Sequence, residues 1–432
     1  MNRFPLASVL VVALVLAALA GCGSPSSPNV PPGSSMVISD KPRDLNPVAV
    51  QGDLSALAEG NAAFATDLYA ALRHGPGNLF FSPYSISTAL AMTYAGAAGD
   101  TSSQMAATLH FDLPAERLHP AFNAYALDLE ARAGQATEGT PFKLSIANSL
   151  WGQQDFPFRT EFLDLLGQNY GAGMRLVDYM ADPEAARRAI NAWVSDETRQ
   201  KIQDLIPEGA IDAMTRLVLA NAIYFKAGWL HPFEDSATGP EPFHLPDGST
   251  LEVSMMHQTE SYGYAVRDGY RALDLPYSSG DTSMLIILPD EGEFEAVEEG
   301  LSPEMILDLT GGLTHGPVIL SLPKFSYTSS FSLHDALTGL GMPDAFDPDR
   351  ADFSGMDDAR DLHISEVLHK AFVLVDEKGT EAAAATAVIM SVTSAPADEP
   401  VSFTIDRPFL YLIRDDQTGM ILFLGRVLNP AE

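Results

Sequence analysis

The segment that decides the fold lies near the C-terminus and reads Glu377-Lys378-Gly379-Thr380-Glu381-Ala382-Ala383-Ala384-Ala385-Thr386-Ala387-Val388-Ile389-Met390-Ser391-Val392-Thr393. Propensity alone predicts a short alanine-rich helix that is capped by Thr380. The second half of the segment favours a strand instead, because residues 386–393 are rich in β-branched side chains. No proline follows Gly379 before Pro396, so nothing in the segment would block a sheet ladder.

The alternation of side chains in this segment sharpens the strand interpretation. Every second residue from Thr380 to Val392 is uncharged, and the first four that follow Thr380 in this series are small. The only charge between Thr380 and Thr393 is Glu381, which lies in the other series. As a strand, the segment would therefore have one face fit for burial and one that tolerates water. An exposed segment of this kind is an aggregation hazard unless it later becomes a strand of the fold.

The rest of the chain predicts an α+β fold, with helices in the first half and strands in the second. Ser82-Pro83 is a typical helix start, since Ser can cap the helix and Pro loses no amide bond there. Helical periodicity is also present at residues 57–72 and 191–198. Strands are predicted at residues 217–225, 273–277, 284–288, 318–322, 401–405, 409–414 and 421–426.

The N-terminus predicts export. Arg3 precedes an unbroken apolar run from Leu6 to Ala20, which is short for a membrane span and typical of a signal peptide over residues 1–21. The run ends in Leu19-Ala20-Gly21-Cys22, which resembles a bacterial lipobox, and Cys22 is the only cysteine of the chain. We therefore expect a lipid on Cys22. Because Gly23 rather than Asp follows, the outer membrane or the cell surface is the expected location.

Residues 22–52 are rich in Ser, Pro, Gly and Asn, and we expect them to form a flexible tether. Apolar periodicity then continues without a second linker, so residues 53–432 are expected to form one domain.

The charge balance excludes several partners. The chain has 432 residues, with 57 acidic and 25 basic side chains and a net charge of −32. A nucleic-acid partner is not expected, because neutralising phosphate needs the opposite sign, and heparin-like polyanions are disfavoured likewise. The charge is explained by solubility or a salty habitat, or by a basic partner.

The common catalytic patterns are absent from the sequence. It has no Gly-x-Ser-x-Gly, phosphate-loop, His-Glu-x-x-His or Gly-x-Gly-x-x-Gly pattern. His363 and His369 flank Glu366, but their spacing places them on neither a common helix face nor a common strand face, so no metal site is expected. Nothing in the sequence predicts a cofactor. Spacing does not test a Ser-His-Asp set whose members are far apart in the sequence.

From about Leu54 to Asn429 the chain resembles the serpin family of protease inhibitors. The resemblance is carried by residues 78–92, by Asn221-Ala222-Ile223-Tyr224-Phe225-Lys226-Ala227-Gly228-Trp229, by residues 368–385 and by Phe403-Thr404-Ile405-Asp406-Arg407-Pro408-Phe409-Leu410-Tyr411. It implies a serpin fold of three β-sheets and about nine helices, with an exposed reactive-centre loop. A serine-type protease would attack this loop, form an acyl-enzyme and be trapped when the loop inserts into the largest sheet.

The resemblance also implies roles for individual residues. The hinge of inhibitory serpins is matched by Glu377, Gly379, Thr380, Ala382, Ala383, Ala384 and Ala385. A polar cluster where the sheet opens is matched by Ser82, Ser85, Asn191, Asn221 and His369. Trp229 and Lys324 match the top of the sheet, where we expect Lys324 to pair with Glu377.

Family spacing from Gly379 predicts the scissile bond at Thr393-Ser394. The loop before Val401 is about one residue longer than in some members, so Val392 and Ser394 are alternatives for the residue before the cut, and Met390 is a more distant one. These side chains favour elastase-like or subtilisin-like targets. No Arg or Lys lies between Lys378 and Arg407, which argues against trypsin-like targets.

The sequence therefore predicts a monomeric protease inhibitor rather than an enzyme. Two alternatives remain: a non-inhibitory serpin-fold binding or carrier protein, and a lipid-anchored hydrolase. The small, uncharged hinge favours inhibition over the first, and the missing nucleophile elbow argues against the second.

Overall fold

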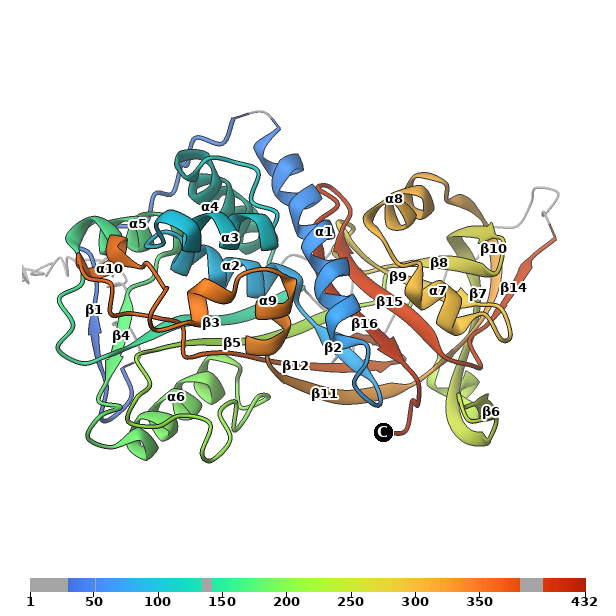
Figure 1. Ribbon diagram of the computed structural model, residues 1–432. Helices are drawn as coiled ribbons and strands as arrows, with labels where there is room; N and C mark the ends of the chain where they lie inside the picture. The colour runs from blue at the N-terminus through green and yellow to red at the C-terminus, as the bar shows by residue number, and fades with distance from the viewer. Residues whose placement is uncertain (1–29, 51, 134–141, 381–398) are drawn as a thin grey trace, which may run out of the picture.

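The computed structural model describes residues 30–50, 52–133, 142–380 and 399–432, and combines two β-sheets with a set of covering helices (Figure 1). Its α-helices are α1 (Asp53–Leu72), α2 (Pro83–Tyr94), α3 (Gly99–Thr108), α4 (Ala115–Arg132), α5 (Thr160–Tyr170), α6 (Pro183–Glu197), α7 (Phe294–Glu299), α8 (Pro303–Gly311), α9 (His334–Leu340) and α10 (Ser354–Asp357). Two short 3₁₀ helices are η1 (Asp235–Ala237) and η2 (Pro343–Phe346).

The predicted hinge enters a seven-stranded sheet, whose order is β1-β4-β3-β5-β13-β12-β11. Its strands are β1 (Ser35–Val37), β3 (Lys143–Gln153), β4 (Met174–Val177), β5 (Leu217–Gly228), β11 (Phe325–Ser332), β12 (Glu366–Asp376) and β13 (Gly379–Thr380). We call this the large sheet, and we call the boundary between β5 and β12 the seam.

The second sheet has the order β14-β10-β7-β8-β9-β15-β16-β2, with β6 paired to β7. Its strands are β2 (Leu79–Phe81), β6 (Gly239–His244), β7 (Thr250–Arg267), β8 (Tyr270–Pro276), β9 (Thr282–Pro289), β10 (Thr314–Pro323), β14 (Val401–Thr404), β15 (Phe409–Asp415) and β16 (Ile421–Val427).

The mixed helix and strand architecture confirms the α+β prediction, although the counts differ slightly. Backbone pairing in the described ranges joins the strands into two sheets rather than three, because β7 is long enough to pair with β6 through its first half and β8 through its second. The same ranges hold ten α-helices, where about nine were expected.

Local sequence explains where α2 begins. The Ser82 side chain accepts a hydrogen bond from the Ser85 amide, and Pro83 occupies the first helical position, as predicted. This cap places Ser82 and Ser85 beneath the large sheet, next to β3, β5 and β12.

Two separate apolar cores hold the layers together. The main core fills the space between the two sheets and most of the helices. A smaller core lies on the other face of the large sheet, where α6 and the residues after it pack onto β3, β4 and β5. Figure 1 shows α6 on this face, opposite α2 and α3.

The N-terminal segment corrects one prediction. Residues 22–52 were expected to be a flexible tether, but β1 pairs with β4 at the edge of the large sheet. Arg43 then donates to Asn123 and Glu130, and Lys41 pairs with Asp164. The prediction is wrong for residues 35–44, because a backbone ladder, hydrogen bonds and ion pairs hold this segment, and Val37 also packs against the main core.

The predicted signal peptide over residues 1–21 and the predicted lipidation site, Cys22, lie outside the described residues. Among the described residues, no helix is both long enough and apolar enough to span a membrane.

Candidate functional site: the hinge and the seam

The described part of the hinge, Glu377–Thr380, turns back at the end of β12 and begins a new strand. Gly379 and Thr380 form β13, which pairs with β12 on one side and with β5 on the other. The chain therefore already occupies the first two positions between the strands of the seam.

Gly379 is required by the close approach of β5. Its φ is +147°, and a Cβ at this position would lie 2.1 Å from the Ala227 carbonyl oxygen. An L side chain would be strained in this conformation and would collide with the backbone.

Thr380 faces the main core, and the alternating residues that follow it in the sequence lie outside the described residues. The residue is 1% exposed, and its hydroxyl lies 2.8 Å from the hydroxyl of Tyr277. The Tyr277 ring in turn stacks on Trp229, with ring centres 4.7 Å apart. Trp229 donates through Nε1 to the Asp376 carbonyl oxygen, so it braces the end of β12 from which the hinge departs.

The expected pair between Lys324 and Glu377 is present. Lys324 Nζ donates to Glu377 Oε2 at 2.7 Å, and the Thr238 hydroxyl donates to Oε1 at 2.9 Å. Burial opposes ionisation of the Glu377 carboxyl, but these hydrogen bonds outweigh it and lower the pKa. The turn is thus held by a charged carboxylate at neutral pH.

Below the hinge the seam is closed. β5 and β12 pair directly in parallel, from Val218 opposite Glu366 to Tyr224 opposite Phe372. A longer inserted strand would have to break this ladder. It would form two antiparallel ladders in its place, if it continued the direction of Gly379 and Thr380.

A polar cluster lies at the middle of the seam. His369 on β12 is directly opposite Asn221 on β5, and Asn221 is directly opposite Asn148 on β3. His369 Nδ1 and Asn221 Oδ1 are hydrogen-bonded across the seam. The Ser82 amide donates to His369 Nε2 at 3.2 Å.

The protonation state of His369 follows from these partners. Nε2 accepts from an amide and Nδ1 faces an amide oxygen, so the ring is neutral with its proton on Nδ1. Burial lowers the pKa of His369 to about 3, in agreement with this assignment.

Asn221 joins His369 to the rest of the cluster. Its Nδ2 donates to the Ser85 hydroxyl at 2.8 Å and to Asn148 Oδ1 at 2.6 Å. The contact between His369 and Asn221 crosses the seam, whereas these two bonds stay on one side of it. Parting of β5 and β12 would therefore break the first and could leave the others intact.

The structure brings four of the five predicted cluster residues together and separates the fifth. Asn191 lies on α6, on the other face of the large sheet, where its side chain exchanges two hydrogen bonds with the Ile206 backbone. Its inclusion in the cluster was wrong, because the large sheet itself lies between Asn191 and the other four residues. Sequence reasoning missed Asn148, although an Asn inside a strand is unusual enough to have signalled it.

Several predicted residues lie outside the described ranges: the hinge alanines 382–385 and the scissile-bond candidates Thr393 and Ser394, with Val392 and Met390. Within the described ranges, no group of three or more His, Cys, Asp or Glu side chains is placed to hold a metal ion.

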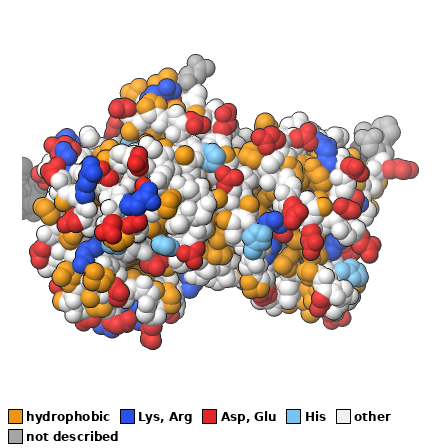
Figure 2. Space-filling model, in the orientation of Figure 1, with side chains coloured by type: hydrophobic (Ala, Val, Ile, Leu, Met, Phe, Trp, Pro, Cys, Tyr) orange, Lys and Arg blue, Asp and Glu red, His pale blue; other side chains and the backbone are white. Residues whose placement is uncertain are grey.

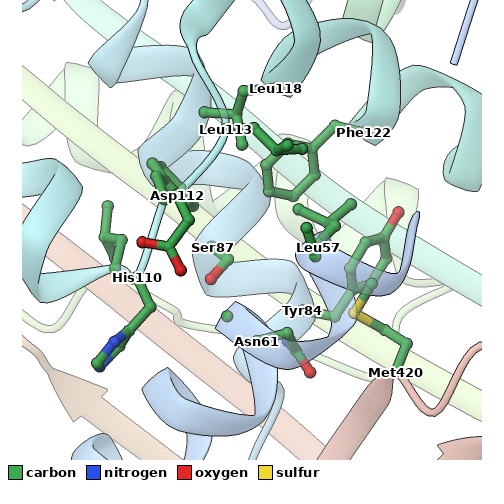
Figure 3. Close-up of a pocket in the computed structure, with 14 residues that line it drawn as sticks. Leu57, Asn61, Tyr84, Ser87, His110, Asp112, Leu113, Leu118, Phe122 and Met420 are labelled. Carbon is green, nitrogen blue, oxygen red and sulfur yellow. The ribbon is translucent and has the colours of Figure 1, made fainter. Parts of the chain in front are cut away.

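A cavity bounded by α1 and α2 is too small for a carried ligand (Figure 3). Its volume is about 10 Å³, and it is lined by Leu57, Asn61, Tyr84 and Ser87 among others. Asn61 Nδ2 and the Ser87 hydroxyl are buried without a protein partner. The space suits about one water molecule rather than a small-molecule ligand.

The surface offers no single dominant charge patch on the face that is visible in Figure 2. Asp and Glu side chains are spread across this face, with Lys and Arg between them. On this face the acidic side chains are therefore distributed rather than gathered.

The fold combines two sheets with covering helices, and Gly379 and Thr380 lie between β5 and β12 of the large sheet. Residues 59–430 match the family described as "Serpin (serine protease inhibitor)". The chain is 39% identical to a serpin-like protein of Thermococcus kodakarensis, over 98% of this chain and 99% of that protein. It is 41% identical to the leukocyte elastase inhibitor of Homo sapiens, over 87% of this chain and 100% of that protein.

A solved structure extends the likeness to three dimensions. The native state of the thermophilic serpin tengpin superposes with a TM-score of 0.80 and 30% identity, over 92% of this chain and 99% of that one. The chain belongs to the serpin family.

Proposed function

We propose that the protein inhibits serine-type proteases as a suicide substrate. The target protease attacks the loop near Thr393-Ser394, its serine oxygen forms an ester with the loop carbonyl, and the amine of the next residue leaves with a proton. The loop then inserts along the seam before water can hydrolyse the ester. The trapped enzyme stays covalently attached.

The observation that carries this proposal is the position of Gly379 and Thr380. They already form the first rungs of a strand between β5 and β12, with Thr380 buried. Continuing this strand to Thr393 would cover about 43 Å, at about 3.3 Å for each residue. About a dozen new hydrogen bonds, each worth about 0.5–1.5 kcal/mol net, would supply on the order of 10 kcal/mol.

Mixing the soluble domain with pancreatic elastase and with subtilisin tests the proposal on one denaturing gel. We expect a covalent complex that survives SDS. Cleavage of the loop without a complex would favour the non-inhibitory alternative. Hydrolysis of a test ester by the protein itself would favour the hydrolase.

The substitution Thr380→Arg tests whether trapping depends on the hinge. It places a charge where the structure has a buried hydroxyl, so insertion should fail and the protein should become a substrate. Thr328→Arg is the matched control, because Thr328 is exposed on β11 of the same sheet. If Thr380→Arg traps protease as well as its parent does, the assigned role of the hinge is wrong.

We also propose that the mature protein is a monomer held to the outer membrane or the cell surface by a lipid on Cys22. The lipobox-like residues 19–22 support this. Mass spectrometry of the N-terminal peptide tests it, and an unmodified Cys22 in membrane fractions would contradict it.

Elastase-like or subtilisin-like targets are proposed from the small and β-branched residues near Thr393. The 41% identity to a leukocyte elastase inhibitor agrees with this choice.

A further inference from the structure

A buried arginine lies between two tryptophans where α6 meets the large sheet. The guanidinium of Arg175, on β4, lies 4.6 Å from the ring centre of Trp193 on α6 and 5.5 Å from that of Trp151 on β3. The two rings meet edge to face, with centres 5.7 Å apart. None of the three residues is more than 7% exposed. We call these three residues the arginine clamp.

The arginine clamp fastens α6 to one side of the seam. Trp151 and Arg175 are directly opposite each other in the ladder between β3 and β4. Trp193, on α6, packs against both of them. A cation over an aromatic face is held more strongly when both groups are removed from water, as they are here. The clamp therefore belongs to the half of the sheet formed by β3, β4 and β5.

The chain that follows α6 is attached to the other side of the seam. Lys370, on β12, donates through Nζ to the Gln203 carbonyl oxygen at 2.7 Å. Lys201 lies 6.0 Å from the ring centre of Phe372, which is also on β12. Leu368 of β12 packs into the small core beneath α6. The layer formed by α6 and residues 198–211 thus bridges the seam.

One of the two attachments must release when the seam opens. The contacts with β12 include an exposed lysine hydrogen bond and a distant cation–ring contact. The clamp is fully buried and continuous with most of the small core. The layer should accordingly leave β12 and remain on β3, β4 and β5.

We propose that Arg175 is a positioning residue for protease trapping, because it retains α6 on β3 and β4 while β12 moves away and so uncovers the seam for the cleaved loop. The inference rests on the inhibitory function proposed above. Without Arg175, α6 would keep its apolar contacts but would be held less firmly on β3 and β4. It would therefore leave β12 more slowly and delay insertion. A delay gives water time to hydrolyse the acyl-enzyme.

Arg175→Met tests this role through the number of inhibitor molecules consumed for each protease trapped. We expect that number to rise about threefold or more, which corresponds to the lower range of cation–π energies. The rate of the first attack on the loop should stay unchanged, since the loop is not altered. Arg175→Lys keeps a cation and should restore part of the efficiency, which a purely space-filling role would not explain.

Arg267→Met is the matched control, because Arg267 pairs with Asp308 on α8, away from α6 and the hinge. An unchanged stoichiometry for Arg175→Met, or an equal rise for Arg267→Met, would overturn the proposal. If Arg175→Met does not fold, Trp193→Phe keeps a ring with a weaker hold on the cation and provides the same comparison.

Tryptophan fluorescence gives an answer that does not need a target protease. The chain has three tryptophans, so Trp229→Phe leaves only the two clamp residues as reporters. After the loop is cut with the cysteine protease papain, the emission maximum of this single variant should stay unchanged. The double variant that also carries Arg175→Met should shift to longer wavelength on cleavage. A shift in the single variant, where Arg175 is still in place, would overturn the clamp.

The two proposals can fail separately. Suppose that no serine protease forms a covalent complex, but cleavage still increases heat resistance and leaves the emission unchanged. The proposed inhibitory function would then be wrong, while the retention of α6 by the arginine clamp during insertion would be supported. If cleavage gives no increase in heat resistance, no strand has been inserted and both proposals fall.

Discussion

The top and the middle of the seam hold the same two strands in different ways. At the top, β13 already separates β5 from β12, and the turn before it is held by the ion pair between Lys324 and Glu377. At the middle, the strands pair directly, and a buried neutral His369 contacts Asn221. For the insertion proposed above, this difference predicts a start at the top, where the contacts are charged and partly exposed. It predicts resistance at the middle, where the contacts are neutral and buried.

Cleavage of the reactive loop should have the largest effect, because it allows the seam to open along its whole length. Insertion worth on the order of 10 kcal/mol should raise the melting temperature by roughly 12 °C, since a domain of about 380 residues unfolds with an entropy of about 0.8 kcal/mol/K. Differential scanning calorimetry of intact and nicked protein measures this. If the nicked and intact proteins melt at the same temperature, the loop has not inserted. The proposed difference between the top and the middle of the seam would then be wrong.

Asn221→Ala should have the next largest effect, because it leaves the His369 Nδ1 proton without its buried partner. We expect a loss of about 3 kcal/mol in the free energy of unfolding, measured by urea denaturation. The uncleaved loop should also insert faster on warming, which its growing resistance to added protease reports.

Asn191→Ala is the control for this change, since it also removes a buried amide but on the other face of the sheet. It should lower stability without speeding insertion. Equal insertion rates in the two variants would show that the polar cluster does not guard the seam.

Acid should weaken the middle of the seam more than its top. The pKa of His369 is about 3 in the folded protein, because burial disfavours the charged ring, against about 6.5 when unfolded. The stability that this residue contributes is complete above pH 6.5 and is lost as the pH falls towards 3. Between pH 7 and pH 5 we expect a loss of about 2 kcal/mol.

Chemical denaturation across this range measures the loss, and His369→Phe supplies the comparison. The variant should lack this part of the pH dependence, whatever its stability at pH 7. A parent and a variant with parallel pH profiles would contradict the assignment of a neutral, buried His369.

Lys324→Met should have the smallest effect. The Lys324 side chain is 38% exposed, so water screens the pair with Glu377, and we expect a loss of at most about 1 kcal/mol. The loss should shrink in about 1 M salt, where surface ion pairs are screened. If Lys324→Met lowers stability as much as Asn221→Ala does, the top and the middle of the seam do not differ in the way described here.

Sequence alone was sufficient for the parts of the site that depend on alternation and local caps. Ser82-Pro83 predicted the start of α2. Thr380 is buried, as expected for the first member of the small, uncharged series, and the burial of the later members stays a prediction. The pair between Lys324 and Glu377 came from family resemblance, since 53 residues separate them.

The errors have a common physical origin. Asn191 was grouped with residues that lie on the other face of the large sheet, and Asn148 was missed, because a residue's face depends on how distant strands and helices stack. Residues 35–44 were expected to belong to a flexible tether because residues 22–52 are poor in large apolar side chains. Their binding uses backbone pairing and ion pairs, which composition does not report.

The small strand β1 has a further consequence for orientation. Ser35 lies opposite Leu176, at the end of the large sheet where β5 begins with Leu217, whereas Thr380 lies beside Ala227 at the far end. The first described strand thus joins the large sheet at one end, and the hinge residue Thr380 lies at the other. If the protein is held to a bilayer through residues before Ser35, the end of the large sheet that carries the hinge would face away from the bilayer, towards arriving proteases. Full insertion of the cleaved loop would move a trapped protease along the seam, to the end of the sheet that faces the lipid.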